Sequence, residues 1–162
     1  MSRREPVVVF TERVEPGPLR RVIDVLQALF GKVESLVDIA LLLETAGHTV
    51  TAAATDPGTA ITTTRTVVDF EDAGIDSVRV VVRGKNNDAA SITVQIYNVT
   101  QGTVMAAAAI TGTTEQTIDG GWTVFRPAGG NEEIEVRVVG NGIDSPVLYA
   151  VHLQGRTTQA RA

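Results

Sequence analysis

The sequence predicts a mainly β protein, in which an extended arm and one long amphipathic, coiled-coil-like helix precede an antiparallel β-sandwich of the jelly-roll type. Three observations lead to this fold class. Apolar residues recur with a helical period over residues 18–46, the period changes to two from residue 48 onward, and turn sequences then separate short β-branched runs. We expect four parts: an arm (1–17), an oligomerisation helix (18–46), a sandwich (47–156) and a flexible tail (157–162).

The arm is interrupted by Pro6 and Pro16 and contains one short apolar run between them. That run consists of Val7, Val8, Val9 and Phe10. It holds too little apolar surface to fold alone, yet it is too apolar for a purely solvated tail. Because an extended Val-rich segment can add a strand to an open sheet edge, we expect the arm to become ordered against a neighbouring chain.

The predicted helix carries a heptad pattern, with apolar residues spaced alternately by three and four positions. The seam consists of Leu19, Val22, Leu26, Leu29, Val33, Leu36, Ala40 and Leu43. Pro18 suits the first helical turn, and Gly47 suits the position that ends a helix. Gly31 leaves a second interpretation open, in which the helix breaks there and two shorter helices fold as a hairpin.

A continuous helix over residues 18–46 would be about 43 Å long, whereas a sandwich of this size is only about 35 Å across. One such helix would therefore overhang the sandwich and leave part of its apolar stripe exposed to water. Association between copies removes that exposure, so the pattern predicts a homo-oligomer. The leucine-rich seam does not by itself determine the number of copies.

From residue 48 onward, alternating apolar residues predict a series of short strands. The turn sequences between them contain the Gly, Asn, Asp and Pro residues that tight connections favour. The expected strands lie near 48–54, 60–70, 76–83, 90–98, 102–111, 113–118, 121–127, 132–139 and 145–154. Eight or so short strands at this spacing are typical of a two-sheet sandwich, most often a jelly roll.

Composition narrows the function classes. The chain has no cysteine, so disulfides and thiolate metal sites are excluded. Its net charge of −5 disfavours a nucleic-acid partner, which would require a basic face. The most apolar stretch, Leu36–Leu43, contains or adjoins several acidic residues and is too short for a transmembrane helix. No signal peptide is recognisable, so we expect synthesis in the cytoplasm and no membrane partner.

Two groups of residues are candidate ligand contacts. Asp69, Glu71, Asp72 and Asp76 crowd one loop between strands, where carboxylates could hold Ca²⁺, although a solvated acidic turn is the simpler interpretation. Trp122 and Tyr97 are the best available platforms for a glycan, although both could equally fill the core or a sheet edge.

No catalytic constellation can be assembled from the sequence. His48 and His152 are the two histidines, and neither has an identifiable nucleophile partner. We expect His48 to cap the end of the helix and His152 to lie in a strand. Glu133 and Glu135 share one strand face and are expected to form the solvent side of a sheet. The sequence therefore predicts a protein that is not an enzyme and has no cofactor.

The segment from Trp122 to Asn131, followed by Ile134–Val138 and Val147–Leu153, resembles the last strands of galactose-binding-like jelly rolls. In those domains a Trp opens one strand, a Gly turn follows, and a final strand closes the sheet. The resemblance implies the fold more strongly than it implies sugar binding.

The whole layout of arm, helix and compact jelly roll resembles small virion structural proteins of tailed phages. This resemblance implies a capsid decoration or head-spike component of the virion, made in the host cytoplasm, that works as a homotrimer and docks on a partner such as the major capsid protein. The alternatives are a tail or tail-fibre structural protein, or a carbohydrate-binding jelly roll that contacts a host glycan.

Overall fold

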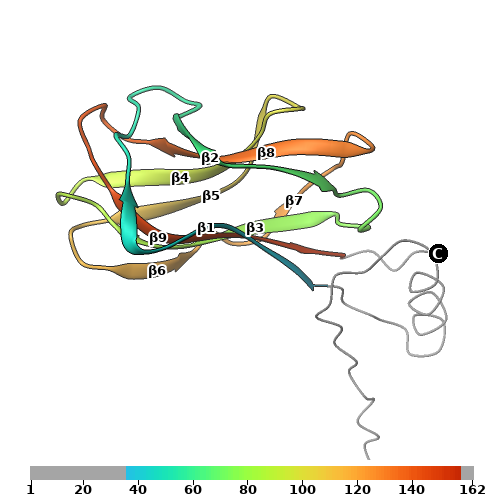
Figure 1. Cartoon of the computed structure of the whole chain (residues 1–162), viewed down its shortest axis with the longest axis horizontal. Helices are drawn as coiled ribbons and strands as arrows, with labels where there is room; N and C mark the ends of the chain where they lie inside the picture. Colours follow the sequence, from blue (N-terminus) through green and yellow to red (C-terminus); the bar gives the residue numbers. More distant parts are fainter. Residues whose placement is uncertain (1–35, 158–162) are drawn as a thin grey trace, which may run out of the picture.

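A computed structural model describes residues 36–157, which form two packed antiparallel sheets (Figure 1). The nine strands are β1 (Leu36–Thr49), β2 (Thr59–Asp69), β3 (Ser77–Lys85), β4 (Ser91–Asn98), β5 (Thr103–Thr111), β6 (Gln116–Asp119), β7 (Thr123–Val124), β8 (Asn131–Val139) and β9 (Val147–Arg156).

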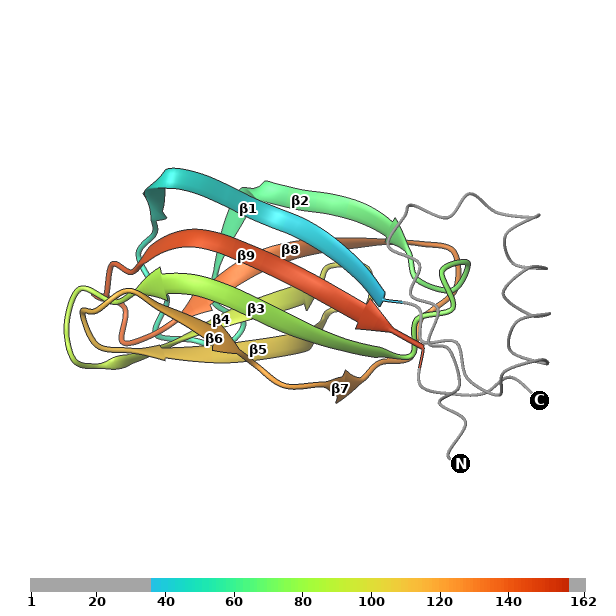
Figure 2. The same cartoon turned by 90° about the horizontal axis from the view of Figure 1, so that it is seen from below.

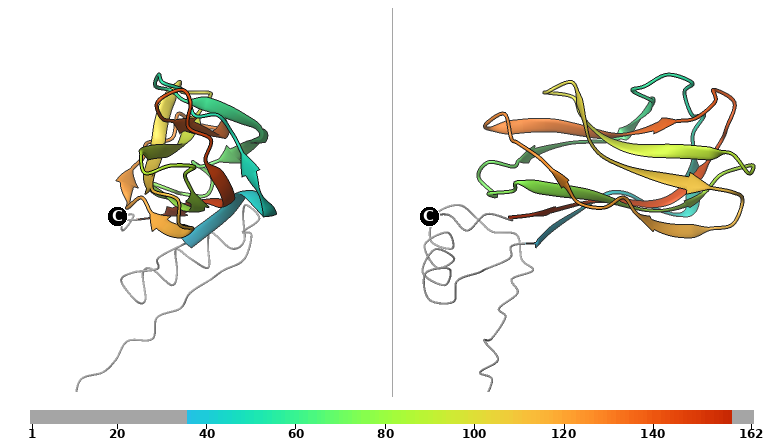
Figure 3. Two further views of the ribbon diagram at one scale, coloured as in Figure 1. Left: turned by 90° about the vertical axis from the view of Figure 1, so that its left-hand side faces the viewer. Right: turned by 180° about the vertical axis from the view of Figure 1, so that it is seen from behind.

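The strand order is that of a jelly roll. One sheet, here called sheet A, runs β1-β9-β3-β6, with the short β7 paired to β3 (Figure 2). The other, sheet B, runs β2-β8-β4-β5. Most connections cross between the two layers, while the β4–β5 and β6–β7 connections stay within one sheet. The layers lie one above the other when the molecule is seen from behind (Figure 3, right). Double-sheet jelly rolls have this arrangement of eight principal strands, so the predicted sandwich is confirmed.

The core lies between the sheets and consists of every second residue of the central strands. Each of these strands contributes three fully or almost fully buried aliphatic side chains. They are Val78, Val80 and Val82 in β3; Ile92, Val94 and Ile96 in β4; Ile134, Val136 and Val138 in β8; and Leu148, Val151 and Leu153 in β9. Burial of each such side chain contributes about 1.5–3 kcal/mol, while the residues between them are placed on the two outer faces.

The predicted helix is wrong wherever the structure describes it, because residues 36–46 belong to strand β1. Val37 and Ile39 pack against the core, whereas Leu36 and Ala40 alternate with them and belong to the opposite face of the strand. A register shift between Ala40 and Leu42 changes the alternation and gives Leu43 the exposed position. The spacing of three and four that indicated a helix is therefore produced here by an irregular strand.

Gly47 does not end a helix either. It has a φ of 81° and lies within the second irregularity of β1, between Leu43 and His48. The other seam residues (Leu19, Val22, Leu26, Leu29 and Val33), the possible break at Gly31 and the arm with Val7–Phe10 lie outside the described residues. Residues 36–157 contain no helix long and apolar enough to cross a membrane.

Most strand predictions agree with the structure. The expected runs at 60–70, 76–83, 90–98, 102–111, 132–139 and 145–154 correspond to β2, β3, β4, β5, β8 and β9 within about two residues at each end. The strands expected at 113–118 and 121–127 are shorter than predicted, since β6 has four residues and β7 has two. The strand expected at 48–54 is mainly a connection, in which Ala53 forms an isolated bridge with Val139.

Candidate functional site

The two aromatic residues selected from the sequence lie on opposite outer faces of the sandwich. Tyr97 lies in β4 of sheet B, and Trp122 lies in the connection between β6 and β7, beside sheet A. Both are partly exposed, and both have an arginine guanidinium stacked near the ring. The structure therefore separates the two candidate glycan contacts into two sites instead of joining them in one.

The cluster around Tyr97 contains a carboxylate shared by two arginines. The guanidinium carbon of Arg137 lies 3.9 Å from the Tyr97 ring centroid, and its Nε and Nη2 donate to Glu135 Oε1 at 2.8 and 2.7 Å. Arg65 donates from Nε and Nη2 to the other oxygen, Oε2, at 2.9 and 2.6 Å. These hydrogen bonds from Arg65 to Glu135, and then the negative charge of Glu135, raise the pKa of the Arg65 guanidinium.

The side chain of Glu135 points away from the core, yet it is 0% exposed. The sequence-based expectation of a solvent face is therefore wrong for Glu135 and holds for Glu133, whose side chain is 37% exposed. Two arginine side chains lying across the sheet explain the difference, since their aliphatic stems cover the surface that they cross. Both oxygens of the buried carboxylate accept hydrogen bonds from arginines.

Trp122 is positioned by a turn that requires glycine. Gly120 donates from its backbone nitrogen to Val80 O at 2.9 Å, and a Cβ at Gly120 would lie 2.2 Å from Ala107 O. Gly121 has a φ of 79° and donates to Asp119 Oδ1 at 2.8 Å. The Gly120–Gly121 turn thus fixes the point at which the chain leaves β6 and brings the indole beside β3 and β9.

Two guanidinium groups contact the indole. The guanidinium carbons of Arg79 in β3 and Arg156 in β9 lie 4.6 and 4.2 Å from the Trp122 ring centroid. Arg79 is also held by Gln154 Oε1, to which its Nε donates at 2.8 Å, and by an ion pair with Asp119. The side chains of Arg79 and Gln154 meet because the two residues are paired across the β3–β9 ladder.

Arg156 differs from Arg79 in having no ion pair with any carboxylate of residues 36–157. Its Nε is buried without a hydrogen-bond acceptor. Together, Trp122, Arg79, Gln154, Asp119 and Arg156 form a partly exposed group, called here the Trp122 face. This face presents an aromatic ring, planar hydrogen-bonding groups and one guanidinium, that of Arg156, which forms no ion pair within the described part of the chain.

Other polar pairs extend over the outer face of sheet A. His152 Nδ1 lies 3.1 Å from Asp38 Oδ1 and links β9 to β1. Arg83 is paired with Glu115 at 2.5 Å, and its guanidinium carbon lies 5.5 Å from the Tyr149 ring centroid. In each of these pairs a cationic or imidazole group lies beside a carboxylate of the same face.

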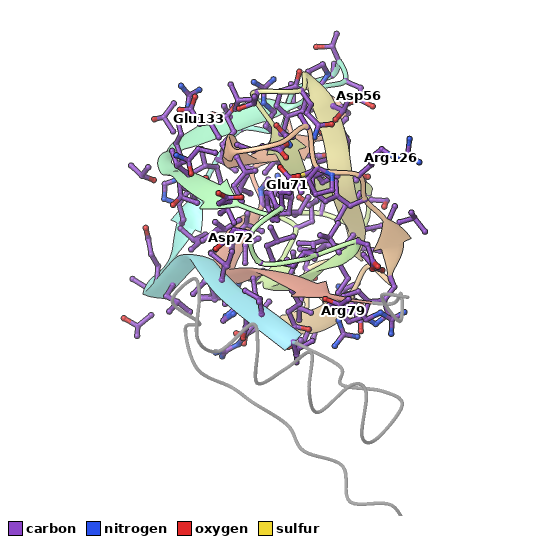
Figure 4. The ribbon with its side chains drawn as sticks, turned by 90° about the vertical axis from the view of Figure 1, so that its right-hand side faces the viewer. Asp56, Glu71, Asp72, Arg79, Arg126 and Glu133 are labelled. Atoms are coloured by element: carbon purple, nitrogen blue, oxygen red, sulfur yellow. The ribbon has the colours of Figure 1, made fainter. Side chains whose placement is uncertain are left out.

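The acidic loop does not assemble a metal site. Within the described residues, no three His, Asp or Glu side chains are grouped to hold a metal ion. Asp69 Oδ1 accepts a hydrogen bond from the Asp72 backbone at 2.9 Å, which is the contact of a polar turn. Glu71 and Asp72 are labelled near the middle of the end view in Figure 4, away from Arg79 beside β9 and Glu133 beside β2.

Both histidines lie in strands. His48 is in β1, with Nδ1 3.4 Å from Glu44 Oε1, so it does not cap a helix as the sequence predicted. His152 is in β9, as expected. Each is paired with a carboxylate on a sheet surface.

Sequence reasoning selected Trp122 but missed the residues around it. Arg79 and Arg156 both lie in strands that the alternation of apolar residues predicts. The same alternation also predicts that their side chains lie on the outer face of the sheet. Their meeting with Trp122 could not, because it depends on β9 lying beside β3 and on the turn that brings β7 to the same edge. No local motif encodes that adjacency.

Comparison with known proteins leaves the family open. No family model matches the chain, and no curated protein matches it in sequence. Among solved structures, it is similar to a family 36 carbohydrate-binding module in complex with calcium and xylotriose, with 13% identity over 71% of this chain and 96% of that chain and a TM-score of 0.46.

Two further structures show comparable similarity. One is the CBM36-1 domain of a multidomain xylanase from the hindgut metagenome of Trinervitermes trinervoides, with 13% identity over 74% of this chain and 96% of that chain and a TM-score of 0.49. The other is from the T13 viral particle of IBDV, with 14% identity over 75% of this chain and 31% of that chain and a TM-score of 0.41. None of these similarities is strong enough to assign a family or a function.

Proposed function

We propose that this jelly roll is a non-catalytic binding module that holds a carbohydrate on the Trp122 face. The observation that carries the proposal is a partly exposed indole beside planar polar side chains that adjacent strands hold in place. A sugar ring has an apolar side that packs on an aromatic ring and hydroxyl groups that need hydrogen bonds. Sites for such ligands combine an aromatic surface with a few fixed polar groups.

The polar groups of the Trp122 face can supply those hydrogen bonds. Gln154 offers an amide, Asp119 is an exposed carboxylate, and Arg79 is already oriented by both of them. Side chains held in this way lose little conformational freedom on binding, which favours affinity. The Tyr97 cluster lacks this capacity because Glu135 and Arg137 hydrogen-bond each other.

The test compares the two aromatic residues as a matched pair. Trp122→Ala and Tyr97→Ala are screened with the wild type against a glycan array, and each binding glycan is then titrated by calorimetry. We expect Trp122→Ala to weaken binding at least about tenfold, in line with the loss of a central aromatic contact, and Tyr97→Ala to leave it nearly unchanged. The proposal is wrong if no glycan binds, or if binding survives the loss of Trp122 and disappears with the loss of Tyr97.

A second function is favoured by a different observation, namely the apolar residues on both sides of β1. Leu36 and Leu43 are 41% and 66% exposed, while Val37 and Ile39 on the other side pack against the core. β1 is also an edge strand. An apolar edge of this kind is expected to be covered by another chain, which suits a virion structural component that assembles with its own copies and with a capsid protein.

This second function is tested by the oligomeric state of the full chain. We expect wild-type protein to be oligomeric in light scattering at micromolar concentration, and Leu43→Asp to dissociate it without unfolding the sandwich. The matched control is Val124→Asp. Val124 is also exposed, at 87%, but it lies in β7, which pairs with β3 and not with β1. A monomeric wild type would remove this function and would leave glycan binding unaffected.

A further inference from the structure

We infer that the ligand of the Trp122 face is an acidic sugar, whose carboxylate is bound by Arg156. This inference rests on the proposed carbohydrate-binding function and adds the charge of the ligand. It begins from a difference between the arginines of residues 36–157: among those that stack on an aromatic ring, Arg156 alone forms no ion pair within this range.

Four arginines of the described residues form ion pairs with carboxylates. Arg65 and Arg137 share Glu135, Arg79 pairs with Asp119, and Arg83 pairs with Glu115. Within residues 36–157, the cations that form no ion pair are Arg156, Arg126 and Lys85. Arg126 is exposed and Lys85 has no aromatic neighbour, so solvation is sufficient for both.

Arg156 differs from these two residues in its contacts. Its guanidinium packs against the Trp122 ring at 4.2 Å, and its Nε is buried without an acceptor. An unsatisfied buried donor on a charged group is unfavourable. The terminal Nη groups of the same guanidinium can donate to a carboxylate, and such charge-assisted hydrogen bonds are stronger than neutral ones.

The position of Arg156 explains why the anion should belong to a sugar. The guanidinium that would hold the anion lies against the ring that would hold the sugar, so one acidic sugar residue can use both. A uronic or sialic acid carries its carboxylate directly on the pyranose ring, within reach of a group adjoining the stacking surface. One unpaired guanidinium also matches the single charge and planar fork of a carboxylate.

The experiment uses the full chain and two ligands that differ in charge. The first is a short oligomer of galacturonic acid, and the second is the same oligomer with its carboxyl groups methyl-esterified. Sialyllactose and lactose form a second acidic and neutral pair. Affinities are measured by calorimetry for the wild type, Arg156→Gln, Arg156→Lys, Trp122→Ala and Arg126→Gln, and melting temperatures confirm that each variant is folded.

We expect the wild type to prefer at least one acidic ligand over its neutral counterpart by about tenfold or more, as one charge-assisted hydrogen bond implies. Arg156→Gln should abolish this preference, Arg156→Lys should keep part of it, and Arg126→Gln should leave it unchanged. The preference should weaken at high salt.

Several outcomes would overturn the inference. If Trp122→Ala abolishes binding while Arg156→Gln leaves the acidic preference intact, the proposed function stands and the assignment to Arg156 is wrong. If neutral glycans bind as tightly as acidic ones, the ligand class is wrong. Arg156-dependent binding of inorganic phosphate or of an acidic peptide, with no glycan binding, would reject both the sugar and the proposed function.

Discussion

The two aromatic clusters of this sandwich contain the same kinds of side chain and differ in how their charges are balanced. Around Tyr97, two arginines enclose a fully buried carboxylate, Glu135, and every oxygen of that carboxylate is used. Around Trp122, two arginines contact the ring, and Asp119 forms an ion pair with Arg79. Both arginines of the Tyr97 cluster, called here the closed cluster, are therefore ion-paired. The Trp122 face, called here the open cluster, contains one arginine, Arg156, that forms no ion pair with a carboxylate of residues 36–157.

The largest effect is expected from removing the carboxylate of the closed cluster. Glu135→Ala should lower the free energy of unfolding by about 3 kcal/mol, because it leaves the guanidinium of Arg137 partly buried over Tyr97 without a counterion. Urea denaturation of the purified variant measures this loss. Glu133→Ala is the control, since Glu133 is more exposed and lies 3.4 Å from Arg65; equal losses for both variants would contradict a special role for Glu135.

A smaller effect is expected at the turn that positions the open cluster. Gly120→Ala should cost about 2 kcal/mol, because the added Cβ would lie 2.2 Å from Ala107 O and the backbone must shift. The fluorescence of Trp122, the single tryptophan, should change as well. Gly121→Ala provides a comparison in which no atom lies near the added carbon and a φ of 79° is the source of strain. A Gly120→Ala protein with unchanged stability and fluorescence would show that the turn does not fix the ring.

Loss of the unpaired arginine should hardly affect stability. Arg156→Gln is expected to change the free energy of unfolding by less than about 0.5 kcal/mol, as for other partly exposed charges without a partner. Arg137→Gln, the matching change in the closed cluster, should cost at least about 1 kcal/mol more because it removes donors from Glu135. Thermal unfolding of the two variants side by side checks this difference, and a reversed order would contradict the distinction between the clusters.

The smallest expected effect concerns pH. The pKa of Arg65 is raised above its ordinary value by Glu135. A raised pKa contributes stability that is complete below the unfolded value and is lost only as pH rises through the folded value, which is above the range where proteins are studied. The difference in the free energy of unfolding between wild type and Glu135→Ala should therefore stay constant from about pH 7 to about pH 9. Denaturant titrations at several pH values measure it, and a steep change would mean that another group titrates with the cluster.

The strands that the sequence predicted well are those with one apolar face. In β8, Ile134, Val136 and Val138 alternate with polar residues, and local pattern and tertiary position agree. β1 was misassigned because its apolar residues occupy both faces and include leucine and alanine, which favour helices. What makes it a strand is the ladder with β9, more than a hundred residues away in the chain, from Leu36 paired with Arg156 onward.

The site was predictable to the same limited degree. Trp122 could be selected because it is a large ring next to a double-glycine turn. The burial of Glu135 could not, because an alternating strand places it on the outer face and only the side chains of Arg65 and Arg137 cover it there. The roles of these charged residues follow from neighbours supplied by other strands, which sequence spacing does not contain.

The strand order also has a consequence for how the protein is made. β8 lies between β2 and β4 in sheet B, and β9 lies between β1 and β3 in sheet A. Both sheets are therefore divided in a nascent chain until these two late strands have left the ribosome. The earlier strands, including the apolar β1, must wait without their partners, and exposed unpaired strands of this kind aggregate readily. Arresting translation before residue 131 should thus yield chains that depend on chaperones, whereas release beyond residue 156 allows both sheets to close.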